Sequence, residues 1–571
     1  MRAIFKKSIS WLAIRRFSSY TYLNLTQFLG ALNDNIYKLL IVYFLIETEG
    51  AENSHIVLAI TSAIFVLPFI LFSASSGTLA DRFSKRNIII FLKAFEILIM
   101  LAGILAFYTH STWALLAILF LLATHSAVFA PSKYGILPEL VATDKITQAN
   151  GIMTSFTFLA IILGTFIASF ILDITARNFI LAAILCTTFS LVGFLASLCI
   201  EYTDPAGSSR RFNILFLREI YDTLKTASQV PSLLCAVFGS AFFLFLGAFV
   251  QLNIIPFAIQ SLDLSDVKGG YLFLLTALGI GTGSILSGKI SGKTVELGIV
   301  PLAAFGVALS CFLIDHFSNW LLPVIPLVML LGLFGGMYQI PLDAYVQLAS
   351  PSTSRGQVVA ATNFLSFIGV LVASLFVYSV TEVFGLSADK GFTLVGALTL
   401  VGALFISWQF FDYLTRLAAF LLSRLHFQMV FHGLKNIPEG PAVYVCYHQA
   451  WNETLILLGA QRRRMRFFIE NEQDHSLWMK RLYHLFCIDP LENTPETLQA
   501  VRQTLEKGIS VTIFVNQVDV KGEVERLKTA FALTDIPFIP VIIESGLKEK
   551  TPNPFSRLLA KFRVPAAVSF G

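Results

Sequence analysis

The sequence predicts an all-α membrane protein of twelve spanning helices in two six-helix repeats, followed by a small cytoplasmic α/β domain. Three observations lead to this fold class. Hydrophobic residues make up 56% of the 571 residues and charged residues only 13%, whereas a soluble domain has about 25% charged residues. Twelve stretches are apolar over the roughly 20 residues that cross a bilayer, and the longest polar connection follows the sixth. The charged fraction then rises from about 10% before His432 to about 23% after it.

The elements follow in order along the chain. Residues 1–20 form a basic, amphipathic N-terminus. The first repeat covers 21–200, with spans expected at 21–46, 56–80, 87–109, 112–131, 150–172 and 178–200. A linker at 201–231 leads to the second repeat at 232–412, with spans at 232–257, 270–290, 297–315, 319–341, 357–381 and 390–412. An amphipathic connector at 413–431 precedes the α/β domain at 432–571. In that domain β-like runs at 442–446, 511–515 and 538–543 alternate with helical stretches at 453–459 and 495–506.

Basic residues predict the orientation and limit the partners. Seventeen Lys and Arg residues lie in the N-terminus, the linker and the loops on their side, and three lie in the alternate loops, at Arg177, Lys268 and Lys390. Because basic loops stay in the cytoplasm, the N-terminus and the C-terminal domain are expected there. A net charge of +5 is too small to indicate nucleic acid as a partner. The six cysteines form no CxxC pair, so no metal site is expected.

The connection between the second and third spans carries a motif that places the chain in a superfamily. Residues 77–86 read GTLADRFSKR, which resembles the GxLaDRxGrr signature of major facilitator transporters. Gly77 permits close helix contact. Asp81 can cap a helix end or pair across the repeats, while Arg82, Lys85 and Arg86 hold the loop at the cytoplasmic face. The resemblance implies that these five residues gate the change between inward-open and outward-open states.

Rarer segments indicate the substrate. They are 27–38 QFLGALNDNIYK, 130–140 APSKYGILPEL, 338–343 YQIPLD, and the start of the eleventh span with Arg355, Gly356 and Asn363. Together they resemble the bacterial lysophospholipid transporter family, a major facilitator branch that flips lysophospholipids across the inner membrane. The resemblance implies a lysophospholipid substrate presented among membrane lipids, and no cofactor.

Polar residues inside the first span are the candidate substrate site. An ionised carboxylate within a membrane is costly unless it is paired or wet, so it indicates function by default. Asn33, Asp34, Asn35 and Lys38 are expected to line a polar cavity that binds a zwitterionic or amine headgroup, together with Asn363. A structural alternative stays open, because Asp34 and Lys38 are four residues apart and can form an ion pair.

Two further acidic positions leave the same choice. Lys93 and Glu96 are spaced to pair with each other on one helix. Asp343 stands near the end of the tenth predicted span, where it either faces the cavity or reaches the membrane interface.

The C-terminal domain resembles glycerophospholipid acyltransferases in which several motifs are altered. Residues 433–453, GLKNIPEGPAVYVCYHQAWNE, are similar to the opening of that family, whose HxxxxD motif supplies a general base and the acid that orients it. His448 and Glu453 occupy these catalytic positions, with Glu in place of Asp. The family's phosphate-binding FPEGTRS motif is replaced by FVNQVDV at 514–520. The basic run at 462–466 could substitute for it, and an active enzyme would need acyl-acyl carrier protein or acyl-CoA as donor.

The sequence therefore favours a lysophospholipid flippase of the bacterial inner membrane, whose fused acyltransferase-like domain receives or senses the lysolipid. Two alternatives remain. One is an active acyltransferase with a membrane half that feeds it lipid. The other is a major facilitator transporter for another amphiphile. The altered phosphate motif argues against a conventional enzyme, because neutral amides cannot form the charge-assisted bonds that hold an anion.

Overall fold

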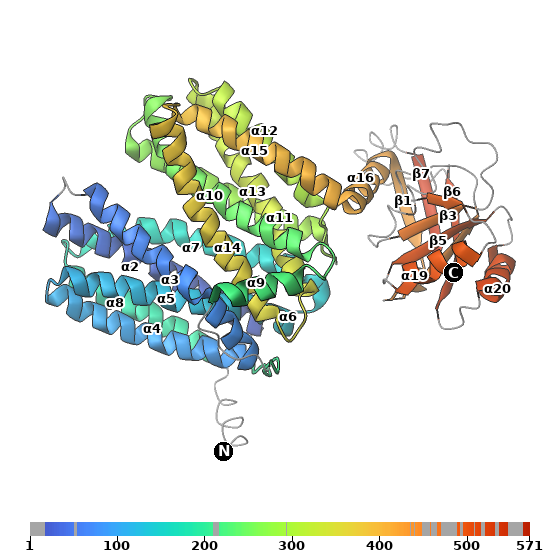
Figure 1. Ribbon diagram of the computed structural model, residues 1–571, viewed down its shortest axis with the longest axis horizontal. Helices are drawn as coiled ribbons and strands as arrows, with labels where there is room; N and C mark the ends of the chain where they lie inside the picture. The colour runs from blue at the N-terminus through green and yellow to red at the C-terminus, as the bar shows by residue number, and fades with distance from the viewer. Residues whose placement is uncertain are drawn as a thin grey trace, which may run out of the picture. The chain divides into compact units, whose positions relative to one another are not determined.

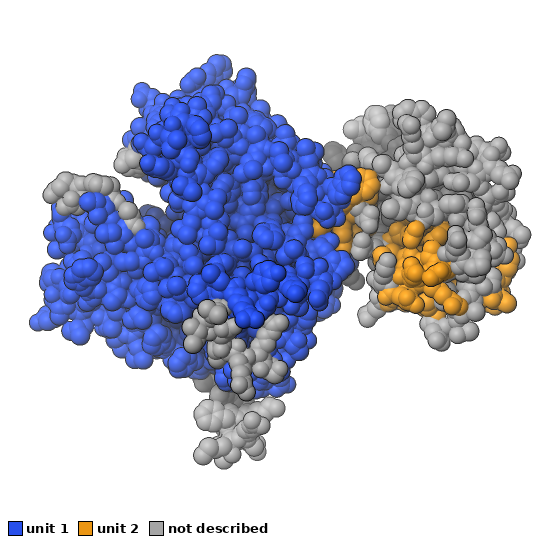
Figure 2. Space-filling view, viewed as in Figure 1, with its two compact units in different colours: residues 1–409 blue, residues 410–571 orange. Residues whose placement is uncertain are grey.

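The protein divides into two compact units, residues 1–409 and residues 410–571 (Figures 1 and 2). The structure is a computed structural model and describes residues 18–50, 54–208, 216–292 and 294–433. Beyond these it describes 436–438, 440–447, 457, 465–469, 488–490, 495–506, 509–515, 520–531, 536–545 and 564–570. Each unit is described by itself below.

Among its described residues, unit 1 contains twelve helices that are long and apolar enough to cross a membrane. The first half consists of α2 (Ser19–Glu49), α3 (Ser54–Arg82), α4 (Lys85–Tyr108), α5 (Thr112–Gly135), α7 (Ile146–Ile174) and α8 (Phe179–Leu198). The second half consists of α10 (Leu233–Gln260), α11 (Asp266–Ser291), α12 (Ile299–His316), α13 (Leu321–Ala349), α14 (Arg355–Tyr378) and α15 (Ala388–Gln409). Short elements lie between them: α6 (Leu137–Leu140), the 3₁₀ turn η3 (Thr143–Lys145), α9 (Phe216–Ala227) and the π-helical turn η4 (Ser379–Val383). The predicted fold class is confirmed.

Polar side chains set several helix starts in unit 1. Ser18, Ser111, Asn178 and Ser265 each occupy an N-cap position, and their side chains accept a bond from the backbone N–H three residues on. These caps satisfy amide donors that have no partner inside the helix. Between the caps the sequences are almost continuously apolar, and many large side chains remain exposed, such as Phe91, Trp113 and Trp408. A belt of exposed apolar side chains is what a lipid-facing surface requires.

Glycines allow the closest helix pairs in the second half. A Cβ at Gly332 of α13 would lie 2.1 Å from the carbonyl oxygen of Thr276 in α11, and a Cβ at Gly279 would lie 2.2 Å from that of Met329. Any side chain at these positions would force the two helices apart. Small residues therefore bring the α11 and α13 backbones into direct contact, as in other membrane helix pairs.

The described part of unit 2 forms a seven-stranded sheet preceded by the helix α16 (Phe411–His426). The strands are β1 (Phe427–His432), β2 (Val443–Tyr447), β3 (Met465–Ile469), β4 (Ile488–Pro490), β5 (Ser510–Val515), β6 (Phe538–Ser545) and β7 (Val564–Phe570). Their order is β1-β7-β6-β2-β5-β3-β4, and only the β6–β7 pair is antiparallel among the pairs described. The central strands β2 and β5 are buried along almost their whole length, as predicted for runs of Val, Ile and Phe in a parallel sheet.

Two helices complete the described part of unit 2: α19 (Pro495–Glu506) and α20 (Val520–Phe531). Val501 and Leu505 of α19 and Val524 and Leu527 of α20 are buried in the same apolar core as β2 and β5. The predicted amphipathic connector proves to be two elements. Its helix ends at His426, and the following six residues form β1, which pairs with β7.

Candidate functional site

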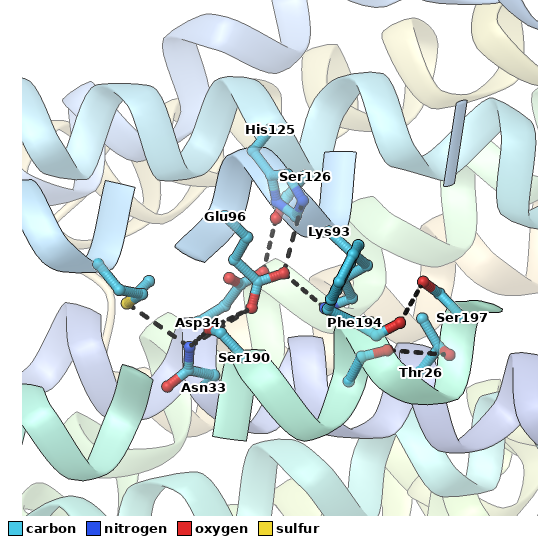
Figure 3. Close-up of polar contacts among 12 residues, drawn as sticks. Thr26, Asn33, Asp34, Lys93, Glu96, His125, Ser126, Ser190, Phe194 and Ser197 are labelled. Atoms are coloured by element: carbon cyan, nitrogen blue, oxygen red, sulfur yellow. Dashed lines mark hydrogen bonds and ion pairs between the residues drawn. The ribbon is translucent and has the colours of Figure 1, made fainter. Parts of the chain in front are cut away.

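A buried ionic cluster lies between α2, α4, α5 and α8 (Figure 3). Lys93 Nζ lies 2.5 Å from Glu96 Oε2, and the two side chains are 1% and 0% exposed. Glu96 Oε1 accepts hydrogen bonds from Ser190 Oγ at 2.8 Å and Asn33 Nδ2 at 3.4 Å, and His125 Nε2 lies 3.5 Å from Oε2. We call Asn33, Lys93, Glu96, His125 and Ser190 the ionic core. Lys93 and Glu96 thus form the ion pair that their spacing permits.

Glycines leave the space that this buried lysine occupies. A Cβ at Gly30 of α2 would lie 2.6 Å from Lys93 Nζ, and one at Gly193 of α8 would lie 3.6 Å from it. Asn33 is fully buried and also donates to Ser190 Oγ at 2.8 Å. Asn33 was expected to line the cavity with Asp34, but its side chain turns into the ionic core instead.

Asp34, the next residue along α2, is half-buried and borders the ionic core, with Glu96 and Lys93 within electrostatic range (Figure 3). Its Oδ2 accepts a 2.6 Å bond from Ser126 Oγ of α5, while Oδ1 has no hydrogen-bond partner among the described residues. Lys38, one turn further along, places its ammonium 4.6 Å from the centre of the Phe65 ring. No ion pair of 4 Å or less joins Asp34 and Lys38 in the described structure, so these two residues do not form the ion pair that their spacing allows. Asn35 donates to the carbonyl of Ala31 in its own helix at 2.7 Å.

A second carboxylate, Asp343 of α13, belongs to the same region. Lys133 of α5 is within electrostatic range of both Asp34 and Asp343, and Tyr134 is within range of Asp343. The Lys133 ammonium lies 4.5 Å from the centre of the Tyr134 ring. All four side chains are half-buried. Asp343 therefore faces α5 of the first half, and it was not among the predicted site residues because a single acid near a helix end gave no sign of what it faces.

Asn363, the remaining predicted site residue in the membrane half, is half-buried in α14. The described contacts do not bring it together with Asp34. The two predicted catalytic residues, His448 and Glu453, lie outside the described residues, as does the altered phosphate motif at 516–519.

Asp81 joins the two halves of unit 1. It is fully buried, and its carboxylate accepts bonds from the backbone N–H groups of Gly356 at 2.7 Å and Gln357 at 2.9 Å. These are in the first turn of α14, where the N-cap Ser354 makes no side-chain bond. The carboxylate of α3 thus takes the place of that cap and places negative charge at the positive end of α14. We call this side of the molecule the Asp81 end.

The other motif residues surround this contact. A Cβ added at Gly77 would lie 2.6 Å from the Cβ of Ala360, so α3 and α14 can pack this closely only because residue 77 is a glycine. Lys85 is buried and pairs with Glu139 of α6 at 2.6 Å. Arg86 donates to the carbonyl oxygens of Leu198 and Ile200 at 3.2 and 3.1 Å, at the end of α8. Arg82 has its guanidinium 6.0 Å from the centre of the Phe83 ring.

Further contacts between the halves lie at the same end. Asn150 of α7 and Gln347 of α13 exchange two buried side-chain hydrogen bonds, of 2.9 and 2.8 Å. Ser155 Oγ donates to the carbonyl of Gly281 in α11 at 2.6 Å. A Cβ at Gly151 would lie 2.4 Å from the carbonyl oxygen of Ser284. The sequence motifs do not predict these contacts, because neutral amides and glycines are common in apolar helices and do not indicate which helix they contact.

The linker helix α9 contacts both halves at this end. Glu219 accepts a hydrogen bond from Thr78 of α3, and Gln357 of α14 donates to the same threonine at 3.3 Å. Ile220 of α9 belongs to an apolar cluster that includes Ala74 of α3 and Ala361 of α14. The linker is therefore part of the contact between the halves.

The opposite end differs. There, the described ion pairs Arg177–Glu47 and Lys390–Asp315 each join two residues of the same half. Figure 2 shows unit 1 hollowed between the lobe with α2, α4 and α8 and the lobe with α10, α12 and α15, on the side away from α6 and α9. The two halves thus meet at the Asp81 end and diverge toward the other end.

Comparison with known proteins decides the family. The family model of the Major Facilitator Superfamily matches residues 23–374. The chain belongs to this superfamily. Solved structures of its fold include the human organic anion transporter MFSD10, with a TM-score of 0.56 and 17% identity. The fucose:proton symporter FucP of E. coli has a TM-score of 0.56 and 14% identity. They cover 68% of this chain and 98% of their own.

Curated relatives of this superfamily member include lysophospholipid transporters. The lysophospholipid transporter LplT of Escherichia fergusonii is 27% identical over 390 residues, which are 67% of this chain and 94% of the relative. The protein of the same name from Photorhabdus laumondii is 26% identical over 351 residues, 60% of this chain and 84% of the relative. Residues 428–544 match the acyltransferase family model, so the superfamily protein carries an acyltransferase domain after its membrane half.

Proposed function

We propose that the protein is a lysophospholipid flippase of the bacterial inner membrane, and that its acyltransferase domain receives or senses the lysolipid. The relatives named lysophospholipid transporters align with the membrane half over most of their own length. The observation that carries the proposal is Asp34. It is a half-buried carboxylate inside a spanning helix, and one of its oxygens has no hydrogen-bond partner among the described residues.

An unpartnered carboxylate oxygen within a membrane suits a cationic ligand group. Leaving such an atom without a bond is costly, so it is expected either to meet water or to bind a ligand. An ammonium headgroup supplies the missing donor and the opposite charge. Lys133, in electrostatic range of Asp34, offers a positive charge for the phosphate that every lysophospholipid carries.

The orientation expected from the basic residues assigns the two ends. With the Asp81 end in the cytoplasm, the state described is closed toward the cytoplasm and receives lipid from the outer leaflet. Release to the inner leaflet then requires the α3–α14 and α7–α11 contacts to open, as in transporters whose two repeats rock about a central site.

Replacing Asp34 by Asn is expected to reduce lysolipid transport at least ten-fold. The amide keeps the size of the side chain and its bond to Ser126, but it removes the charge that binds an ammonium group. The measurement is uptake of labelled lysophosphatidylethanolamine by cells that lack their own flippase, with the amount of inserted protein determined by immunoblot.

Asp173→Asn is the matched control, because Asp173 is an exposed carboxylate of α7 in the same half. It is expected to leave uptake unchanged. Normal uptake by a well-inserted Asp34→Asn protein would remove Asp34 from the binding site.

The full-length protein is expected to show little or no acyl transfer to lysophosphatidylethanolamine with acyl-CoA or acyl-acyl carrier protein as donor. General-base help by His448 is worth about 10²–10⁴-fold, but fixing the acceptor contributes up to about 7–11 kcal/mol. The sequence at 516–519 lacks the Glu, Gly and Arg that fix the phosphate in the related family. Lipid products are followed by mass spectrometry, and His448→Ala serves as the inactive reference. Robust turnover that His448→Ala abolishes would establish an active enzyme.

A further inference from the structure

We infer that Asp343 is the headgroup-selecting carboxylate of the second half, which binds the ammonium group of amine-bearing lysophospholipids. The inference rests on the proposed function and goes one step beyond it. It gives the second half a specific partner for the substrate, whereas the charged residues predicted to bind substrate, Asp34 and Lys38, both lie on α2.

The position of Asp343 is fixed by its neighbours. Gln339, one turn earlier in α13, donates from Nε2 to Asp343 Oδ1 at 2.6 Å. Asp343 also lies beside Ser240 of α10. Asp343 interacts electrostatically with Lys133 and Tyr134, which belong to α5 in the other half. A carboxylate on the lipid-facing side of α13 would be too far from the opposite half for such an interaction. Asp343 therefore lies on the side of α13 that faces the first half.

The polar groups around Asp343 are incompletely satisfied. Gln339 is 9% exposed, and its Oε1 atom has no hydrogen-bond partner among the described residues. Lys133 makes no ion pair of 4 Å or less within the described residues, although two carboxylates are within its electrostatic range. Gln339 Oε1 lacks a donor, and the Asp343 carboxylate beside it is bonded to the neutral amide nitrogen of the same glutamine. These two acceptors suit a ligand group that donates several hydrogen bonds. A primary ammonium has three such donors.

The charges fit a zwitterion better than an anion. One ammonium, Lys133, stands within range of two carboxylates, Asp34 and Asp343, which belong to different halves. A headgroup that carries both a phosphate and an amine supplies a negative charge for Lys133 and a positive charge for the carboxylates. Its phosphate meets Lys133, and the three donors of its amine are shared among Asp34, Asp343 and the oxygen of Gln339 that lacks a hydrogen bond in the described structure. A headgroup with phosphate alone leaves Asp343 without a counter-ion, and repulsion from that carboxylate weakens binding.

The test compares two lysolipids in the full-length protein. Uptake of labelled lysophosphatidylethanolamine and of lysophosphatidylglycerol, which has no amine, is measured for the wild-type protein, Asp343→Asn, Asp343→Ser and Asp343→Glu. Loss of a charge-assisted bond predicts a fall of about ten-fold in the ethanolamine-to-glycerol ratio for the two neutral variants. Asp343→Glu keeps the charge and is expected to keep a ratio within about three-fold of the wild type.

Asp263→Asn is the matched control, since Asp263 is an exposed carboxylate in the turn between α10 and α11. Two neutral replacements of different size ensure that poor insertion of one leaves the other to be measured. An unchanged ratio, or an equal loss of both substrates, overturns the inference while leaving the proposed function in place. If the wild-type protein transports neither lipid, the proposed function fails and the inference fails with it.

Discussion

Replacing Glu96 by Gln is expected to destabilise the membrane half more than any exposed charge deletion. The substitution leaves the Lys93 ammonium buried at 1% exposure, with His125 beside it and without the carboxylate 2.5 Å away. Breaking a buried ion pair by removing one partner costs about 3–5 kcal/mol, because the remaining charge stays out of water. We expect less monodisperse protein after extraction and a lower temperature of unfolding in detergent.

The paired variant Lys93→Met/Glu96→Gln separates charge from packing. Methionine removes the orphaned charge, and the Gln oxygen can still accept from Asn33 and Ser190. It is expected to regain most of the stability that Glu96→Gln loses. Glu47→Gln is the control, because its pair with Arg177 is 51% and 62% exposed and such pairs contribute about 0–1 kcal/mol. If Glu96→Gln is no more destabilising than Glu47→Gln, the ionic core is not a structural requirement.

Asp81→Ala is expected to reduce transport about ten-fold or more while leaving the preference for headgroups unchanged. The variant loses both bonds to the α14 amides and the negative charge at the N-terminus of that helix. Helix capping contributes about 0.5–2 kcal/mol, so the balance between the two conformations shifts away from closure at the Asp81 end. The prediction is that this end opens more often, since the lost bonds exist only when α3 and α14 are together.

Accessibility at the Asp81 end measures this shift. A cysteine placed at Ser284, which is fully buried beside Gly151, should react faster with a water-soluble maleimide in the Asp81→Ala background. The parent protein without that cysteine gives the background of the native thiols. Asp204→Ala, at an exposed position of the linker, is the control. Unchanged labelling, or a changed headgroup profile, would contradict a gating role for Asp81.

The length of the apolar stretches made the membrane fold predictable, but not the ends of its helices. The prediction for the fifth span began at residue 150, whereas α7 begins at Ile146, and α13 runs to Ala349 although its predicted span stopped at 341. The extra turns carry polar residues that a hydropathy pattern excludes. Gln347 is buried in such a turn because Asn150 of the opposite half supplies its hydrogen-bond partner.

The charged groups show a similar division. The i,i+3 spacing of Lys93 and Glu96 indicated their pair correctly, because both partners are on one helix. Asp34 and Lys38 have an equally good spacing but turn to Ser126 and Phe65, which belong to other helices. Lys133 and Asp343 are 210 residues apart, and nothing local relates them. Tertiary neighbours decided each of the cases that sequence spacing could not.

The C-terminal sheet was only partly predictable. Runs of buried Val, Ile and Phe identified β2, β5 and β6, which are central in the sheet. Residues 427–431 of β1 were taken into the amphipathic connector, because they continue the run of apolar residues around Arg416 and Arg424 in the preceding helix. Its strand character comes from pairing with β7 at the far end of the domain sequence.

The position of α9 also constrains how the two halves can part. Its Glu219 is bonded to Thr78 of α3, while its Phe216 ring packs edge-on against Phe364 of α14, with centroids 6.2 Å apart. When α3 and α14 separate, α9 can travel with one of them only, and the other set of contacts must break. The linker therefore raises the free-energy barrier between the two conformations of each transport cycle. Substitutions in α9 can then change the turnover rate although α9 does not contact the lipid.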